Sequence, residues 1–212
     1  MLSRPIPSSG EMVPVVGIGT WQAFDVGTSR AELDPRREVL ETLFKAGGKV
    51  IDSSPMYGRA EAVTGTLLRE MQARDKAFVA TKVWTSGEAQ GIRQMQESSA
   101  KMAAPVVDLM QVHNLVDWRV HLKTLRKWKE EGRIRYIGIT HYTDGALDDL
   151  MAFLRSEQID FVQFAYSIGQ RAPESRFLPF VQERGVATLI NRPLGSGGLF
   201  GATRGKALPA IA

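Results

Sequence analysis

The chain has 212 residues, 43% hydrophobic and 24% charged, and its 27 Lys and Arg against 23 Asp and Glu give a formal net charge of +4. This composition is ordinary for a packed globular domain and excludes a disordered or collagen-like chain. The length favours one domain spanning residues 1–212. The chain has no cysteine, which excludes disulfides and thiolate nucleophiles, and only three histidines, so we predict no metal site.

The distribution of charge and hydropathy bears on partners and location. Basic residues are scattered, so we predict no nucleic-acid surface, and a pocket for a phosphorylated small molecule fits the charge equally well. No segment approaches the roughly 18 apolar residues of a membrane span. Residues 1–20 lack the basic start and apolar core of a secretory signal. We therefore expect a soluble, cytoplasmic protein with no membrane partner.

Short apolar runs recur about every 25–36 residues, which is the size of one strand-plus-helix unit. They do not alternate with polar residues, a pattern typical of parallel strands buried on both faces. The predicted strands are Val13–Gly19, Lys49–Asp52, Phe78–Lys82, Asp108–His113, Tyr136–Thr140, Phe161–Phe164 and Ala187–Asn191. The predicted helices are Pro35–Ala46, Glu61–Arg69, Gly91–Met102, Val120–Glu131, Asp144–Arg155 and Arg176–Arg184. Asp34 is the expected N-cap of the first helix, with Pro35 at its first position.

Seven strand–helix units predict either a doubly wound open sheet or a (β/α)8 barrel of the TIM type. A doubly wound sheet usually carries a glycine fingerprint after its first strand. Here Gly17-Ile18-Gly19-Thr20-Trp21-Gln22 has no third glycine and leads into no helix. Polar and aromatic residues instead end several strands, which is how a barrel builds its active site. We therefore predict the barrel.

Three segments carry a more specific pattern. Strand two leads into Asp52-Ser53-Ser54-Pro55-Met56-Tyr57-Gly58, strand three ends in Thr81-Lys82, and strand four reads Asp108-Leu109-Met110-Gln111-Val112-His113. In these elements, from about Val13 to Phe200, the chain resembles the aldo-keto reductase family. The resemblance implies NAD(P)H-dependent reduction of an aldehyde or ketone, with Asp52, Tyr57, Lys82 and His113 as catalytic residues.

The residue types themselves permit this chemistry. A free tyrosine has a pKa near 10, and a neighbouring ammonium such as that of Lys82 lowers it. Asp52 can hold Lys82 through a charge-assisted hydrogen bond. Tyr57 would then donate a proton to a carbonyl oxygen, and a neutral His113 would polarise that carbonyl. Taken singly, each has a structural alternative: a turn cap, a rim aromatic, a solvated lysine and a hydrogen-bonded histidine.

The resemblance also implies where the cofactor binds. The family holds the nicotinamide carboxamide with a Ser-Asn pair after strand five and a Gln on strand six; here Thr140 and His141 occupy the first place and Gln163 the second. After strand seven, the family's aromatic and Ser-Pro-Leu-Gly loop lies along the diphosphate. The corresponding residues, which we assign to the cofactor together with Thr20, are Asn191, Arg192, Pro193, Leu194 and Gly195.

Two tryptophans follow strands at positions where the family lines its substrate pocket. Trp21 follows the first strand and Trp84 the third, so we predict that both line the pocket for a small carbonyl substrate. Packing at the barrel rim is the alternative. Trp118 and Trp128 fall in a loop and on a helix face, and we interpret them as structural.

The family's eighth strand has no counterpart, and Thr203–Ala212 reads as a loop. We expect NADP as cofactor, with NAD as the alternative. The family's residues that decide between the two follow the eighth strand and have no counterpart in this sequence. Unpaired first and seventh strands predict self-association through the open barrel edges. Three interpretations remain: a carbonyl reductase, a nucleotide-binding regulatory relative without turnover, and an inactive truncated relative. The four catalytic residues favour the reductase.

Overall fold

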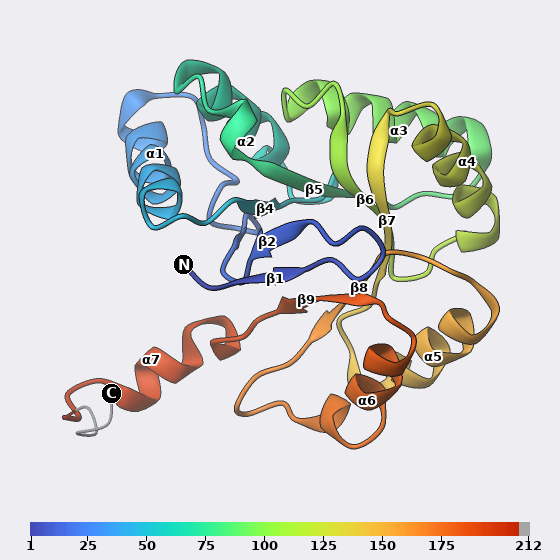
Figure 1. The fold of residues 1–212 in the computed structure, drawn as a ribbon. Helices are drawn as coiled ribbons and strands as arrows, with labels where there is room; N and C mark the ends of the chain where they lie inside the picture. The colour runs from blue at the N-terminus through green and yellow to red at the C-terminus, as the bar shows by residue number, and fades with distance from the viewer. Residues whose placement is uncertain (208–212) are drawn as a thin grey trace.

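The computed structural model describes residues 1–207 and contains a parallel sheet curved into a nearly closed barrel, with helices on its outer surface (Figure 1). Its seven strands lie in the order in which they occur in the chain, and this confirms the predicted barrel architecture. The strands are β3 (Ile18–Gly19), β4 (Val50–Asp52), β5 (Phe78–Val83), β6 (Val107–His113), β7 (Ile134–Thr140), β8 (Phe161–Ala165) and β9 (Ala187–Asn191). Among the described residues, β3 and β9 are the two unpaired ends of the sheet.

Each strand is connected to the next by a helix that packs its apolar face on the sheet, and one further helix follows the last strand. Leu122, Leu125 and Trp128, at helical spacing in α4, are all buried against it. The helices are α1 (Arg30–Lys45), α2 (Ala60–Glu70), α3 (Glu88–Lys101), α4 (Trp118–Glu130), α5 (Leu147–Ser156), α6 (Phe177–Glu183) and α7 (Gly198–Thr203). Short 3-10 turns are η1 (Arg74–Lys76), η2 (Asp144–Ala146), η3 (Ala172–Glu174) and η4 (Gly195–Gly197). No helix within residues 1–207 is long and apolar enough to cross a membrane.

The start of α1 differs from the prediction. The helix begins at Arg30 with Ser29 as N-cap, so Asp34 is not the cap and Pro35 lies inside the helix. Ser29 Oγ donates a hydrogen bond to Glu32 Oε2 over 2.6 Å, and the Ser29 backbone N–H lies 3.4 Å from the same oxygen. This Ser-x-x-Glu arrangement stabilises an earlier start than the proline position suggested.

The predicted first strand, Val13–Gly19, is divided in the structure. Its beginning belongs to a separate antiparallel hairpin formed by β1 (Ser3–Pro5) and β2 (Met12–Pro14). Only Ile18–Gly19 joins the barrel, beside β4. Ile6, in the hairpin loop, is 2% exposed and packs in a cluster with Phe78, Leu109, Tyr136 and Phe161. The hairpin therefore covers the end of the barrel at which the parallel strands begin.

The carboxyl-terminal part of the chain also departs from the prediction. The glycine-rich segment after β9 forms η4 and then α7, whereas a loop was predicted there. Figure 1 shows α7 projecting away from the barrel. The predicted loop Thr203–Ala212 begins at the last residue of α7, and residues 208–212 lie outside the described part of the chain. The glycines of this segment have low helix propensity and so predicted a loop, whereas Leu199 and Ala202 favour the helix that forms.

Candidate active site

Polar side chains from five consecutive strands meet at the carboxyl ends of the barrel. They occupy alternate strand positions, which point to the same face of the sheet. Lys82 pairs in register with Gln111, and Thr140 lies between His113 and Gln163. All of them are buried. The buried polar residues of this cluster are Asp52, Lys82, Gln111, His113, Thr140 and Gln163.

Lys82 is the largest fully buried polar side chain of the cluster, with no exposed surface. Its Nζ donates hydrogen bonds to Asp52 Oδ1 at 2.9 Å, Asp52 Oδ2 at 2.8 Å and the Ser53 carbonyl oxygen at 2.6 Å. Gln111 Nε2 donates to Asp52 Oδ1 at 3.2 Å. Three acceptors around the ammonium offset the free-energy penalty of burying it. The predicted contact between Asp52 and Lys82 is thus present.

Tyr57 lies in the loop between β4 and α2, with its ring centroid 5.2 Å from Lys82 Nζ. Burial raises the pKa of its phenol above the ordinary value, and the Lys82 charge acts in the opposite direction. The sequence predicted a lowered pKa because it took account of the ammonium alone. That expectation is corrected here: desolvation of the buried phenolate outweighs the favourable charge.

His113 ends β6 and is 6% exposed. Its Nδ1 lies 2.7 Å from Thr140 Oγ1, and its ring makes an edge contact with Trp84 at a centroid distance of 6.4 Å. Burial, with the Lys82 charge as a second cause, lowers the pKa of His113 from 6.5 to about 3. The imidazole is therefore neutral at physiological pH, as the predicted role requires.

The residues assigned to the cofactor before β9 differ in burial and in hydrogen-bond partners. Gln163 is buried, and its Oε1 has no hydrogen-bond partner among residues 1–207. The Thr140 hydroxyl is engaged with His113. His141 is half-buried and its Nδ1 accepts a hydrogen bond from the Thr143 backbone N–H at 3.3 Å. Thr20 is fully buried with its Oγ1 2.8 Å from Ser53 Oγ, so its hydroxyl supports the loop after β4.

The segment after β9 lies at the same end of the barrel as the other site residues, since it follows the carboxyl end of a parallel strand. Asn191 is half-buried, whereas the four residues that follow are exposed: Arg192, Pro193, Leu194 and Gly195. Arg192 has a left-handed backbone with φ 54°, and its Cζ lies 5.8 Å from the ring centroid of Trp21. Trp21 and Trp84 are 49% and 41% exposed, so their lining of a substrate pocket stays a prediction beside the alternative of packing at the rim.

Sequence reasoning missed three residues of this site. Gln111 fixes Asp52, the Ser53 carbonyl accepts from Lys82, and Tyr142 stacks on His141 with ring centroids 5.8 Å apart. Gln111 was detectable, because it lies two residues before His113 and so faces the same side of β6. No local pattern marks Ser53 or Tyr142.

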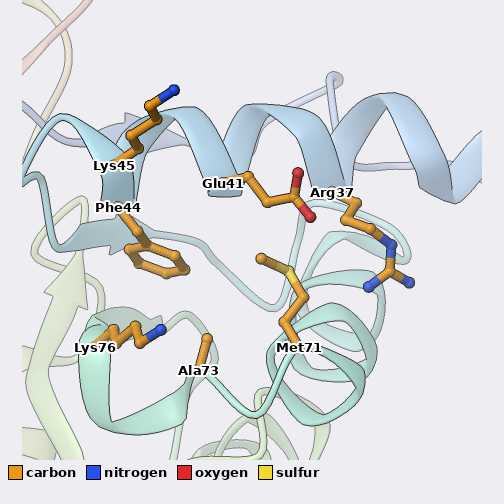
Figure 2. A pocket seen from close by; sticks show the side chains of 7 residues that line it. All are labelled: Arg37, Glu41, Phe44, Lys45, Met71, Ala73 and Lys76. Carbon is orange, nitrogen blue, oxygen red and sulfur yellow. The ribbon is translucent and has the colours of Figure 1, made fainter.

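A hollow lies outside the barrel, between α1 and the segment from α2 to η1 (Figure 2). It has a volume of about 590 Å³ and is lined by Arg37, Glu41, Phe44, Lys45, Met71, Ala73 and Lys76. None of the residues predicted for catalysis or cofactor binding lines it. In the described part of the chain, no three His, Cys, Asp or Glu residues are grouped as metal ligands.

Comparisons with known proteins fit this geometry. A model of the aldo/keto reductase family matches residues 15–209. The chain belongs to the aldo/keto reductase family. Aldo-keto reductase YhdN of Bacillus subtilis is 23% identical over 92% of this chain and 63% of its own length. An NADH-specific methylglyoxal reductase of Escherichia coli is 25% identical over 95% of this chain and 70% of its own.

Solved structures show the same fold. An aldo-keto reductase from Klebsiella pneumoniae in complex with NADPH superposes with a TM-score of 0.80 at 23% identity, covering 93% of this chain and 70% of that one. These shares mean that the chain spans about two thirds of the length of its family relatives. At this identity, the superposition establishes the barrel and leaves the chemistry to the site residues.

Proposed function

We propose that this protein catalyses the NAD(P)H-dependent reduction of an aldehyde or ketone to an alcohol. The observation that carries the proposal is the fully buried Lys82, held by Asp52 and lying 5.2 Å from the Tyr57 ring. If the Lys82–Asp52 pair had only a structural role, it would add little stability, because a buried ion pair is often no more stabilising than apolar packing. A reductase, by contrast, uses that charge to tune a proton donor.

Tyr57 is the proposed proton donor. Its raised pKa keeps the phenol protonated at neutral pH, so that the proton is present when a carbonyl oxygen acquires negative charge. The Lys82 ammonium stabilises the phenolate that remains. The Asp52 carboxylate and the Ser53 carbonyl fix the ammonium in place, and in this scheme they act as positioning groups.

His113 is the proposed hydrogen-bond donor to the carbonyl. The Asn114 backbone N–H donates to Thr140 Oγ1 at 3.4 Å, which leaves the hydroxyl proton free to point at His113 Nδ1. The neutral ring then carries its own proton on Nε2. An N–H in that position orients the carbonyl and polarises it.

The residues at the strand ends fit a nicotinamide cofactor. Gln163 Oε1 is a buried acceptor without a partner among residues 1–207, and a carboxamide N–H would satisfy it. His141 is the proposed second contact, and the main chain of the segment from Asn191 to Gly195 is the proposed support for the diphosphate. When bound, the reduced cofactor would supply the hydride. NADPH is the proposed cofactor, since the Klebsiella relative binds it, and NADH is the second candidate, given the NADH-specific Escherichia coli relative.

Replacement of one hydroxyl tests the proposal. Tyr57→Phe should lower kcat for a neutral aldehyde, such as 4-methylbenzaldehyde, by about 10²–10⁴-fold, because general acid catalysis contributes that much. The affinity for NADPH, measured by fluorescence titration, should change little, since the proton moves only during reaction. Tyr166→Phe is the matched control: it removes a hydroxyl that bonds Glu174 and should retain turnover.

Three outcomes are informative. Full activity in Tyr57→Phe would reject Tyr57 as proton donor. NADPH binding without turnover of any carbonyl by the wild-type chain would favour the regulatory alternative. Neither binding nor turnover would favour an inactive relative.

A further inference from the structure

Three loops at the carboxyl ends of the strands converge on one guanidinium group. Arg192 Cζ lies 5.8 Å from the Trp21 ring centroid and 5.2 Å from that of Tyr142. Trp21 follows β3, Tyr142 follows β7, and Arg192 itself follows β9. The Tyr142 ring is in turn stacked on His141 with an interplanar angle of 15°. Arg192 therefore lies across the mouth of the site, between two aromatic side chains.

The charge of Arg192 has no protein counter-ion in the described part of the chain. Other cations of the barrel do have one: Lys82 pairs with Asp52, and Arg135 pairs with Asp108 and Glu11. No hydrogen bond or ion pair within residues 1–207 involves the Arg192 guanidinium. Aromatic rings contact the face of a guanidinium and leave its N–H donors free for a planar anion.

Arg192 also acts on the reacting end of the site. Its charge lowers the pKa of Tyr57, although burial is the largest cause and the net shift is upward. This effect shows that the guanidinium lies close enough to the phenol for their charges to interact. The left-handed backbone at Arg192, φ 54°, is uncommon for a residue with a side chain and turns the chain sharply after β9.

We propose that Arg192 binds a carboxylate or phosphate group of the substrate, so that this protein selects anionic aldehydes and keto acids over neutral carbonyl compounds. The proposal rests on the reductase function proposed above. The same guanidinium could bind the cofactor diphosphate, which is the role predicted from the sequence. The substrate is the favoured source, because Arg192 lies over Trp21, a predicted wall of the substrate pocket.

A matched pair of substrates separates the two sources. The pair is 4-formylbenzoate and its methyl ester, and the measured quantity is the ratio of their kcat/KM values. Arg192→Gln should lower this ratio at least about tenfold, because a bidentate ion pair with the carboxylate is lost. Arg192→Lys keeps the charge without the planar guanidinium, and its kcat/KM ratio should lie between those of the wild type and Arg192→Gln. Arg184→Gln is the control. It removes an exposed arginine just past α6, at the amino end of the β9 strand, and should leave the ratio unchanged.

Binding without turnover gives a second readout. Benzoate and benzamide are titrated calorimetrically into the NADP-saturated protein. Wild type should bind benzoate more tightly, and Arg192→Gln should bind both ligands equally. An unchanged kcat/KM ratio together with a weakened Kd for NADPH would assign Arg192 to the diphosphate and overturn the proposal. Arg192-dependent benzoate binding in a protein that reduces no carbonyl would reject the reductase function while keeping the anion site.

Discussion

Every residue of β5 and β6 is buried between neighbouring strands. Within residues 1–207, by contrast, β9 has a neighbour on one side only, and none of its residues is fully buried. We call β4–β6 the closed wall, and β9 with Arg192–Gly195 the open edge. Two cations show the consequence. On the closed wall, Lys82 is fully buried and held by three oxygen atoms. At the open edge, Arg192 is exposed and lies against aromatic rings.

The same repeated strand–helix unit therefore provides two kinds of environment for a charged side chain. Strands with neighbours on both sides exclude water and hold charged groups at fixed distances, which pre-organises them for proton transfer. An edge strand leaves its final residues accessible to solvent, which suits the recognition of molecules that arrive and leave. The predictions below test the proposed contrast by perturbing one side at a time.

The largest effect is expected from Lys82→Met. Removing the ammonium leaves Asp52 as a buried carboxylate without its cation, which typically costs about 3–5 kcal/mol in the free energy of unfolding. Urea denaturation measures this loss. In protein that remains folded, the pH dependence of alcohol oxidation should shift upward, because Lys82 no longer lowers the pKa of Tyr57.

Lys101→Met is the control for that variant. Lys101 forms an exposed ion pair with Glu97, in which the side chains are 46% and 66% exposed. Its loss should cost less than about 1 kcal/mol. Equal destabilisation by the two replacements would contradict the distinction between closed wall and surface.

Two leucines that face the barrel interior compare the closed wall with the open edge directly. Leu109 on β6 is fully buried, and Leu189 on β9 is half-buried against the same cluster. Leu109→Ala should lower the free energy of unfolding by about 2–5 kcal/mol, and Leu189→Ala by about half as much or less, since less apolar surface is withdrawn from water there. Denaturation of both variants by urea measures the difference. A larger loss in the free energy of unfolding for Leu189→Ala than for Leu109→Ala would show that the open edge is packed at least as tightly as the closed wall.

The protonation of His113 should make the free energy of unfolding depend on pH. Its pKa is about 3 in the folded protein and near 6.5 when unfolded, so the unfolded chain binds more protons between these values. Folding stability should therefore fall as the pH drops below 6.5, by at most about 1.4 kcal/mol per pH unit from this group. His113→Asn should flatten the dependence measured by denaturation between about pH 5 and about pH 7. A variant with the wild-type slope would show that His113 is not buried as a neutral ring.

The smallest effect concerns association through the open edge. We expect the chain to self-associate through the unpaired backbone groups of β3 and β9, with a sedimentation coefficient that rises with concentration. Thr188→Lys places a charge on the exposed face of β9 and should weaken this association by about 0.2–1 kcal/mol per pair of strands. Gln182→Lys, on the exposed face of α6, is the control. Concentration-independent sedimentation of the wild type would reject the interface.

The sequence determined the parts of this protein that depend on local periodicity. Apolar runs such as Phe78–Lys82 and Asp108–His113 predicted strands whose ends the structure places within one or two residues. The order of strand and helix units predicted the barrel, because parallel strands need a crossover between them. The spacing of Asp52, Lys82 and His113 predicted that they meet, since each ends a strand at the same side of the sheet.

Tertiary structure decided what depends on the partners of each residue. Whether Val13–Gly19 joins the barrel depends on the pairing of Met12–Pro14 with Ser3–Pro5, which no local pattern encodes. Whether the pKa of Tyr57 rises or falls depends on how much water surrounds the phenol, and burial outweighs the charge of Lys82. The position of Arg192 between Trp21 and Tyr142 arises from three loops distant in the chain. Periodicity fixes which way a side chain faces, but only packing fixes its neighbours, and the neighbours set its chemistry.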